Sequence, residues 1–156
     1  MLPIIILLPL VLGTTLVSWL KQFSRGVTAL AAIGVSLSSL ILLLTQAKHV
    51  FNGGTITQTW AWLPQLGIDL SFRMDALGLL FSLLISGIGT LIYIYAYYYL
   101  SPKSSLSKLY VLLMLFMAAM LGISLSNNLI LLLIFWELTS ISSFLLVGYW
   151  NNYEAA

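Results

Sequence analysis

Five long apolar stretches constrain this chain more than any other feature of its sequence. Stretches of about 17 to 25 apolar residues are long enough to cross a lipid bilayer as helices. Within a bilayer the backbone must satisfy its own hydrogen bonds, which a continuous helix does. The polarity of these stretches does not alternate as it does in the strands of a membrane barrel. We therefore predict an all-α, polytopic membrane protein with five transmembrane helices, at residues 2–20, 27–45, 76–100, 109–126 and 129–150.

The overall composition agrees with this prediction. The 156 residues are 61% hydrophobic and only 6% charged, whereas soluble domains average about 25% charged residues. The formal net charge is +2, and the sequence has neither a basic cluster nor an aromatic platform of the kind that binds nucleic acid. The expected surroundings are thus a lipid bilayer and other membrane subunits, without nucleic acid.

Side chains that carry enzymatic chemistry are scarce. The chain has no cysteine, its single histidine is His49, and its four acidic residues are far apart in the sequence. Disulfides, thiol chemistry and most zinc sites are therefore excluded, and a metal site of ordinary ligand spacing is not expected. We predict no metal, no cofactor and no enzymatic activity.

The first apolar stretch resembles a secretory signal peptide only in part. It has no positively charged residues before its apolar core and no small-residue cleavage site after it. We therefore expect an uncleaved transmembrane helix that is distorted at Pro9, as membrane helices tolerate.

Basic residues in the short links predict the orientation. Lys21 and Arg25 follow the first stretch, and Lys103 and Lys108 follow the third. Short loops rich in Lys and Arg stay in the cytoplasm. This places the N-terminus outside and, after five crossings, the C-terminus in the cytoplasm.

The 46–75 connection predicts an extracytoplasmic β-hairpin. Residues alternate in polarity from Ile56 to Trp62 and again from Leu66 to Phe72, with the turn residues Pro64 and Gly67 between them. Aromatic residues at either end of the third stretch are typical of a membrane-surface belt. They are Trp60, Trp62, Tyr93, Tyr95, Tyr97, Tyr98 and Tyr99.

Small residues recur at helical spacing on two of the stretches. Such faces let membrane helices approach closely, so we expect helix contacts there. The faces comprise Ala29, Ala32, Ser36 and Ser39 on the second stretch, and Ser82, Ser86 and Gly89 on the third.

Glu137 is the single charged residue inside the fifth stretch. It lies about 12 Å along the helix from Leu129, where an ionised carboxylate costs on the order of 3 kcal/mol. The carboxyl group must stay protonated or find a cation and water, and a group balanced between these states can relay protons. The alternative is a neutral buried acid that only bonds a neighbouring helix.

The residues near Glu137 are rich in hydroxyl groups. Ser140, Thr139, Ser142 and Ser143 could hold water beside the acid, or they could bond to carbonyl groups of their own helix. Asp75 precedes the third stretch, where an acid favours a helix N-terminus; the alternative is a role in admitting ions.

Two segments resemble a known family. FRMDALGLLFSLLISGIGTLIYIYAYYYL and NNLILLLIFWELTSISSFLLVGYW are similar to the N-terminal region of the A-type subunit of Mrp-type multi-subunit Na⁺/H⁺ antiporters. That subunit is similar to the chain-5, antiporter-like subunit of respiratory complex I (NADH dehydrogenase). The resemblance covers essentially the whole chain, most specifically residues 72–150, and FWELTSISSF favours the Mrp type.

The resemblance implies that Glu137 takes part in a proton pathway, where a lysine on a later helix modulates it. The chain is then expected to be a single membrane domain, residues 1–156, that forms the N-terminal fragment of a longer subunit. It would belong to a hetero-oligomeric complex in the bacterial inner membrane that exchanges H⁺ for Na⁺. Two alternatives stay open: a proton-translocating membrane subunit of an NADH:quinone oxidoreductase, and a structural membrane subunit without transport.

Overall fold

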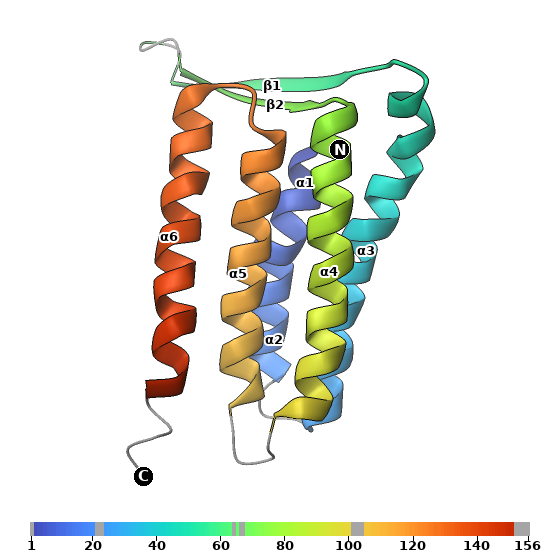
Figure 1. The fold of residues 1–156 in the computed structure, drawn as a ribbon. Coiled ribbons are helices and arrows are strands. Elements are labelled where there is room, and N and C mark those ends of the chain that lie inside the picture. The colour runs from blue at the N-terminus through green and yellow to red at the C-terminus, as the bar shows by residue number, and fades with distance from the viewer. Residues whose placement is uncertain (1, 21–23, 64, 66–67, 101–104, 152–156) are drawn as a thin grey trace.

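The computed structural model describes residues 2–20, 24–63, 65, 68–100 and 105–151. Long helices stand side by side and alternate in direction, and a two-stranded sheet lies across one end of the bundle (Figure 1). The elements in chain order are α1 (Leu2–Leu7), η1 (Leu8–Gly13), α2 (Thr14–Leu20), α3 (Arg25–Phe51), β1 (Ile56–Leu63), β2 (Ile68–Met74), α4 (Ala76–Tyr99), α5 (Leu106–Leu125) and α6 (Leu129–Asn151).

Four of the described helices are long and apolar enough to cross a membrane. They are Arg25–Phe51, Ala76–Tyr99, Leu106–Leu125 and Leu129–Tyr149. The apolar part of the first segment, Ile4–Leu20, is shorter and is divided among α1, η1 and α2. The structure therefore supports the prediction of a mostly helical multi-pass membrane protein, with four spans by length and composition.

The first segment widens into a π-helix at η1, where the sequence predicts a distortion. Pro9 has no backbone N–H and cannot complete the α-helical hydrogen-bond pattern. The hydroxyl group of Thr14 donates to the carbonyl of Leu10, and that of Thr15 donates to the carbonyl of Val11. The predicted distortion at Pro9 is confirmed, and its form is a π-helical segment rather than a simple kink.

The ends of α3 are set by local chemistry rather than by apolarity. Ser24 caps its N-terminus, with its hydroxyl oxygen accepting from the N–H of Val27 at 3.4 Å. The helix continues six residues beyond the predicted end at residue 45 and finishes at Phe51, before Gly53 adopts a φ of +86°. Glycine takes this left-handed conformation without steric strain.

The small-residue faces mark the contact between α3 and α4. Ala32 and Ser36 on α3, and Ser82 and Ser86 on α4, are each 0% exposed. The hydroxyl groups of Ser36 and Thr90 lie 2.8 Å apart across this contact. The predicted close approach of these helices is thus confirmed.

Tyr93 differs from the prediction of a membrane-surface belt. It is 1% exposed, and its ring lies edge-on to that of Tyr110, with centroids 5.5 Å apart. The hydroxyl group of Tyr110 donates to the backbone carbonyl of Tyr93 at 2.7 Å. Tyr93 faces α5 because it follows Thr90 on the buried side of α4, whereas Tyr95, Tyr97, Tyr98 and Tyr99 are exposed.

The predicted β-hairpin is present between α3 and α4. Strands β1 and β2 pair antiparallel, with Gln58 opposite Phe72 and Trp60 opposite Leu70. Because paired residues share one face of a sheet, the buried side chain of Phe72 shows that this face covers the bundle. The expected turn residues Pro64 and Gly67, and Leu66, lie outside the described residues.

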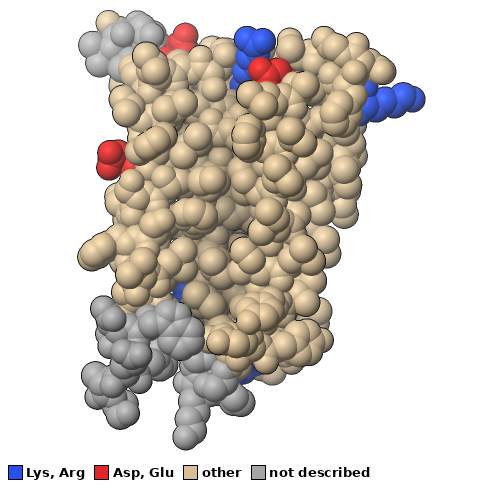
Figure 2. Space-filling view, in the orientation of Figure 1, with Lys and Arg blue, Asp and Glu red and all other residues tan. Residues whose placement is uncertain are grey.

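Charged side chains lie mainly near the two ends of the bundle. Figure 2 shows basic and acidic groups near the hairpin end and basic groups near the opposite end, with an otherwise apolar side between them. One acidic group interrupts that side. This distribution suits a protein whose middle is surrounded by lipid or by other membrane helices.

Candidate functional site

Two asparagines fix the start of α6, the helix that carries Glu137. The side-chain oxygen of Asn128 accepts from the N–H of Leu131 at 2.8 Å, and its backbone carbonyl accepts from the N–H of Leu132 at 3.1 Å. This is the bonding of a helix N-cap, a position that asparagine favours. Glu137 therefore has a fixed distance from a capped helix end.

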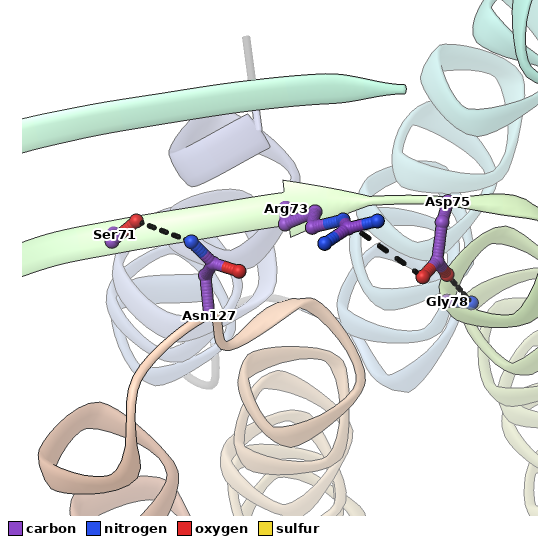
Figure 3. Close-up of polar contacts among 5 residues, drawn as sticks. All are labelled: Ser71, Arg73, Asp75, Gly78 and Asn127. Carbon is purple, nitrogen blue, oxygen red and sulfur yellow. Dashed lines mark hydrogen bonds and ion pairs between the residues drawn. The ribbon is translucent and has the colours of Figure 1, made fainter. Parts of the chain in front are cut away.

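The same link ties α6 to the hairpin. The backbone N–H of Asn127 donates to the carbonyl of Ser71 at 2.9 Å, and its side-chain amide donates to the Ser71 hydroxyl at 2.9 Å (Figure 3). The side-chain amide of Asn128 donates to the carbonyl of Asp69 at 2.5 Å. We call residues 126–128 together with β2 the hairpin clamp, because these bonds hold the α5–α6 link against the sheet.

One side of α6 packs tightly on α5. Phe135 lies against Gly122, where a Cβ atom would meet the ring at 2.2 Å. Further along, Ser142 is 0% exposed, and the hydroxyl group of Tyr149 donates to the carbonyl of Ser105 at 3.1 Å. The helix axes can approach here because glycine has no side chain.

The other side of α6 carries Glu137 and is exposed. Trp136 and Phe144 on this helix are 57% and 77% exposed, and Glu137 and Ser143 also belong to the exposed class. Among the described residues, no cation lies within ion-pair distance of the Glu137 carboxylate. Figure 1 shows α6 at the edge of the bundle, beside α5. The acid therefore faces whatever surrounds this bundle.

The hydroxyl groups near Glu137 bond to their own helix. Thr139 and Ser140 both donate to the carbonyl of Trp136, at 2.6 Å and 3.3 Å. Ser142 donates to the carbonyl of Leu138 at 2.8 Å. Each hydroxyl has only one hydrogen to donate, so in this arrangement these groups can offer only acceptor oxygens to a neighbour.

Asp75 caps α4. Its carboxylate accepts from the N–H of Gly78 at 2.8 Å and lies 4.0 Å from the side chain of Arg73 (Figure 3). The capping bond satisfies a helix N–H that has no partner within the helix. This geometry gives Asp75 the role of a helix N-terminal charge and places it in the hairpin end of the bundle, away from Glu137 in sequence and structure.

An apolar hollow of about 400 Å³ lies between the hairpin and α6. Trp62, Leu70 and Phe72 line it from the sheet, and Ile134 and Phe135 line it from α6. Glu137 follows Ile134 by three residues, so the two side chains lie on neighbouring parts of the helix surface. The hollow brings apolar surface, rather than polar groups, close to the acid.

The described residues contain no group of three or more metal-ligating side chains. The site is therefore one carboxyl group at membrane depth on a well-anchored helix, and its chemistry is proton binding or pairing with a cation. Sequence reasoning singled out Glu137 but missed Asn127 and Asn128. An asparagine directly before an apolar run is an N-cap signal, and it could have identified Asn128.

Comparisons with known proteins identify relatives of the chain. Residues 60–110 match the family described as the N-terminus of chain 5 of NADH-ubiquinone oxidoreductase (complex I). The A1 subunit of the Na⁺/H⁺ antiporter of Staphylococcus aureus is 42% identical over all 156 residues. The chain spans only 20% of the length of that relative. The resemblance to the A-type antiporter subunit, together with that to the complex I subunit, is confirmed, and the named relatives are transporter subunits rather than enzymes.

Two solved structures share the fold. A chain of the membrane-bound sulfane sulfur reductase, an archaeal respiratory membrane complex, superimposes with a TM-score of 0.77 at 22% identity over 92% of this chain and 22% of its own. A chain of the Mrp complex from Dietzia sp. DQ12-45-1b gives a TM-score of 0.59 at 26% identity over 86% of this chain and 15% of its own. The helical arrangement thus recurs in multi-subunit membrane complexes.

Proposed function

We propose that the chain is a component of a monovalent cation/proton antiporter, in which Glu137 carries protons in exchange for Na⁺. The observation that carries this proposal is the 42% identity, over every residue of the chain, to a Na⁺/H⁺ antiporter subunit. The activity is assigned to a hetero-oligomeric complex rather than to this chain alone. No cofactor is needed, because the transported ions are the reactants.

The position of Glu137 supports the proton-carrying role. The carboxyl group lies about 12 Å along α6 from Leu129, on the side that the described helices do not cover. A cation that approaches from a neighbouring segment favours the ionised carboxylate, and its departure favours the protonated form. Alternation between these two states moves one proton. Acids at this depth are functional in most membrane proteins.

The substitution Glu137→Gln in the complete complex tests this role. Glutamine keeps the size and the hydrogen-bonding capacity of the side chain but cannot ionise. We expect Na⁺-dependent proton flux into inverted vesicles to be lost while the complex still assembles. Asp69→Asn is the matched control, because Asp69 is an exposed acid of the hairpin and its backbone carbonyl, rather than its carboxylate, bonds Asn128. Normal flux in Glu137→Gln would refute the proton-carrying role.

A proton-translocating subunit of an NADH:quinone oxidoreductase is the second candidate. The match of residues 60–110 to chain 5 of complex I favours it. In that case the electron chemistry belongs to other subunits. Proton uptake by the purified complex that requires NADH and a quinone, rather than a Na⁺ gradient, would favour this candidate.

A structural subunit without transport is the third candidate. Glu137 would then bond a neighbouring helix as a neutral acid. This candidate predicts that Glu137→Gln leaves proton flux intact, so the same experiment separates it from the first.

We also propose five spans in a bacterial inner membrane, with the N-terminus outside and the C-terminus in the cytoplasm. The 19 residues of Leu2–Leu20 extend about 28 Å as a helix, close to the thickness of the hydrocarbon core. Arg25 and Lys108 lie at the end of the bundle opposite the hairpin, which supports a cytoplasmic position for that end. A reporter fused to the N-terminus and found in the cytoplasm would refute the orientation.

A further inference from the structure

Ser86 presents a buried hydroxyl group that has no hydrogen-bond partner in the described part of the chain. Its side chain is 0% exposed and lies on the side of α4 that faces α3 and α5. Buried polar groups in proteins are almost always paired, either with other groups of the protein or with an ordered water. This hydroxyl therefore needs a ligand of its own.

Two bonded pairs of hydroxyl groups flank Ser86. Ser82 lies one turn before it on α4, and its oxygen is 2.9 Å from that of Ser124 on α5. Thr90 lies one turn after it, and its oxygen is 2.8 Å from that of Ser36 on α3. The hydroxyl group of Ser86 thus lies between a contact to α5 and a contact to α3.

Counting hydrogens shows what these pairs can still offer. Each hydroxyl donates once and has two acceptor positions. Ser124 donates to the carbonyl of Leu121 at 3.0 Å, so the hydrogen between Ser82 and Ser124 comes from Ser82.

The second pair follows the same logic. Thr90 donates to the carbonyl of Ser86 at 2.8 Å, so the hydrogen between Ser36 and Thr90 comes from Ser36. The oxygen atoms of Ser82 and Ser36 therefore both keep acceptor positions toward the surroundings of Ser86, whose own hydroxyl still has a hydrogen to donate.

The spacing on α4 suits a single small ligand. Side chains four residues apart on a helix have Cβ atoms roughly 5–6 Å apart, which is too far for a direct bond of about 2.8 Å between their hydroxyl groups. Two such bonds in series span this distance. The oxygen of Ser36 also lies 3.5 Å from the carbonyl oxygen of Ser86, so α3 reaches the same place.

The geometry points to a bound water molecule between the hydroxyl groups of Ser82 and Ser86. The water accepts from Ser86 and donates to Ser82 and Ser36, which gives the roughly three hydrogen bonds that buried waters usually make. The result is a continuous chain of hydroxyl groups and water from Ser124 on α5 to Thr90 on α4. Helices α3, α4 and α5 are then joined by one polar connection at membrane depth.

Radiolytic hydroxyl-radical footprinting of the membrane protein in lipid nanodiscs tests this site. The sulfur of Met117 accepts from the hydroxyl groups of Ser36 at 3.6 Å and Tyr93 at 3.8 Å, so radicals formed from the water should oxidise it. Met114, which is 0% exposed on the same helix and lies against Gly13, is the internal control. We expect Met117 to be oxidised several-fold faster than Met114, and this difference to disappear in Ser86→Ala.

The substitution separates the bound water from access along the surface. Met117 also lines an apolar groove between α4 and α5, and radicals that arrive through this groove would oxidise it equally in Ser86→Ala. An unchanged oxidation rate in that variant, or equal rates for Met117 and Met114 in the unmodified protein, overturns the proposal. If Ser86→Ala fails to fold, Ser82→Ala removes an acceptor of the same water and carries the same expectation.

Discussion

Gly122 is the position where one added methyl group should disturb the contact between α5 and α6. A Cβ atom at this residue would lie 2.2, 2.3 and 2.5 Å from three atoms of the Phe135 ring. Ordinary contact begins at 3.4 Å, so the ring must retreat by about 1.2 Å. The ring is 9% exposed and lies 6.4 Å from that of Phe72, so α6 itself must shift.

Two opposing effects set the magnitude. Overpacking of a tight contact typically costs about 1–3 kcal/mol. Alanine is a better helix former than glycine by roughly 0.5–1 kcal/mol, which offsets part of this. We therefore expect Gly122→Ala to lower the free energy of unfolding by about 1 kcal/mol.

Equilibrium unfolding in mixed micelles, followed by tryptophan fluorescence, measures this loss. Gly87→Ala is the control, because a Cβ atom at Gly87 of α4 would meet nothing within 4 Å. It should leave stability unchanged or raise it slightly. The double variant Gly122→Ala/Phe135→Leu should regain stability relative to the sum of the two single changes, since the smaller side chain leaves room for the methyl group. Equal stability of Gly122→Ala and Gly87→Ala, or strict additivity in the double variant, would refute the packing argument.

Two further predictions concern hydrogen bonds. Asn128→Ala removes the cap of α6 and should cost about 1 kcal/mol of stability, with faster amide exchange at Leu131; Asn128→Asp keeps the acceptor oxygen and should retain slow exchange, and equally fast exchange in both variants would contradict the cap. Tyr110→Phe removes the donor to the carbonyl of Tyr93 and should lower the free energy of unfolding by roughly 1 kcal/mol, whereas Tyr97→Phe, at an exposed position, should not; equal effects would show that the buried bond adds no stability.

The helices were predictable because the bilayer demands long apolar runs. The third, fourth and fifth stretches agree with α4, α5 and α6 to within three residues at each end. Apolarity reports the hydrocarbon layer rather than the helix itself, so it missed the extension of α3 through Lys48 and His49 to Phe51. The π-helical form of η1 was not predictable, because proline predicts a disturbed hydrogen-bond pattern but not how the neighbouring residues resolve it.

The candidate site was only partly predictable. The depth of Glu137 follows from counting residues along one helix. The contacts of α6 with the hairpin depend on residues 56 and 59 positions apart in the sequence, and no local pattern contains them. Tyr93 was misassigned for a related reason: five tyrosines near one helix end resemble a belt, and only the position of α5 shows which one is buried.

The hairpin clamp has a consequence for how the protein is made. Its two halves, β2 and residues 126–128, are separated by α4 and α5, and two crossings of a membrane return the chain to the side from which it started. The bonds from Asn127 and Asn128 to the strand can form only if both helices have been inserted completely and in opposite directions. A chain that skipped one crossing would leave the asparagines and the strand on different sides of the bilayer. The clamp therefore makes correct insertion of two helices a condition for anchoring the third, the one that carries the acid.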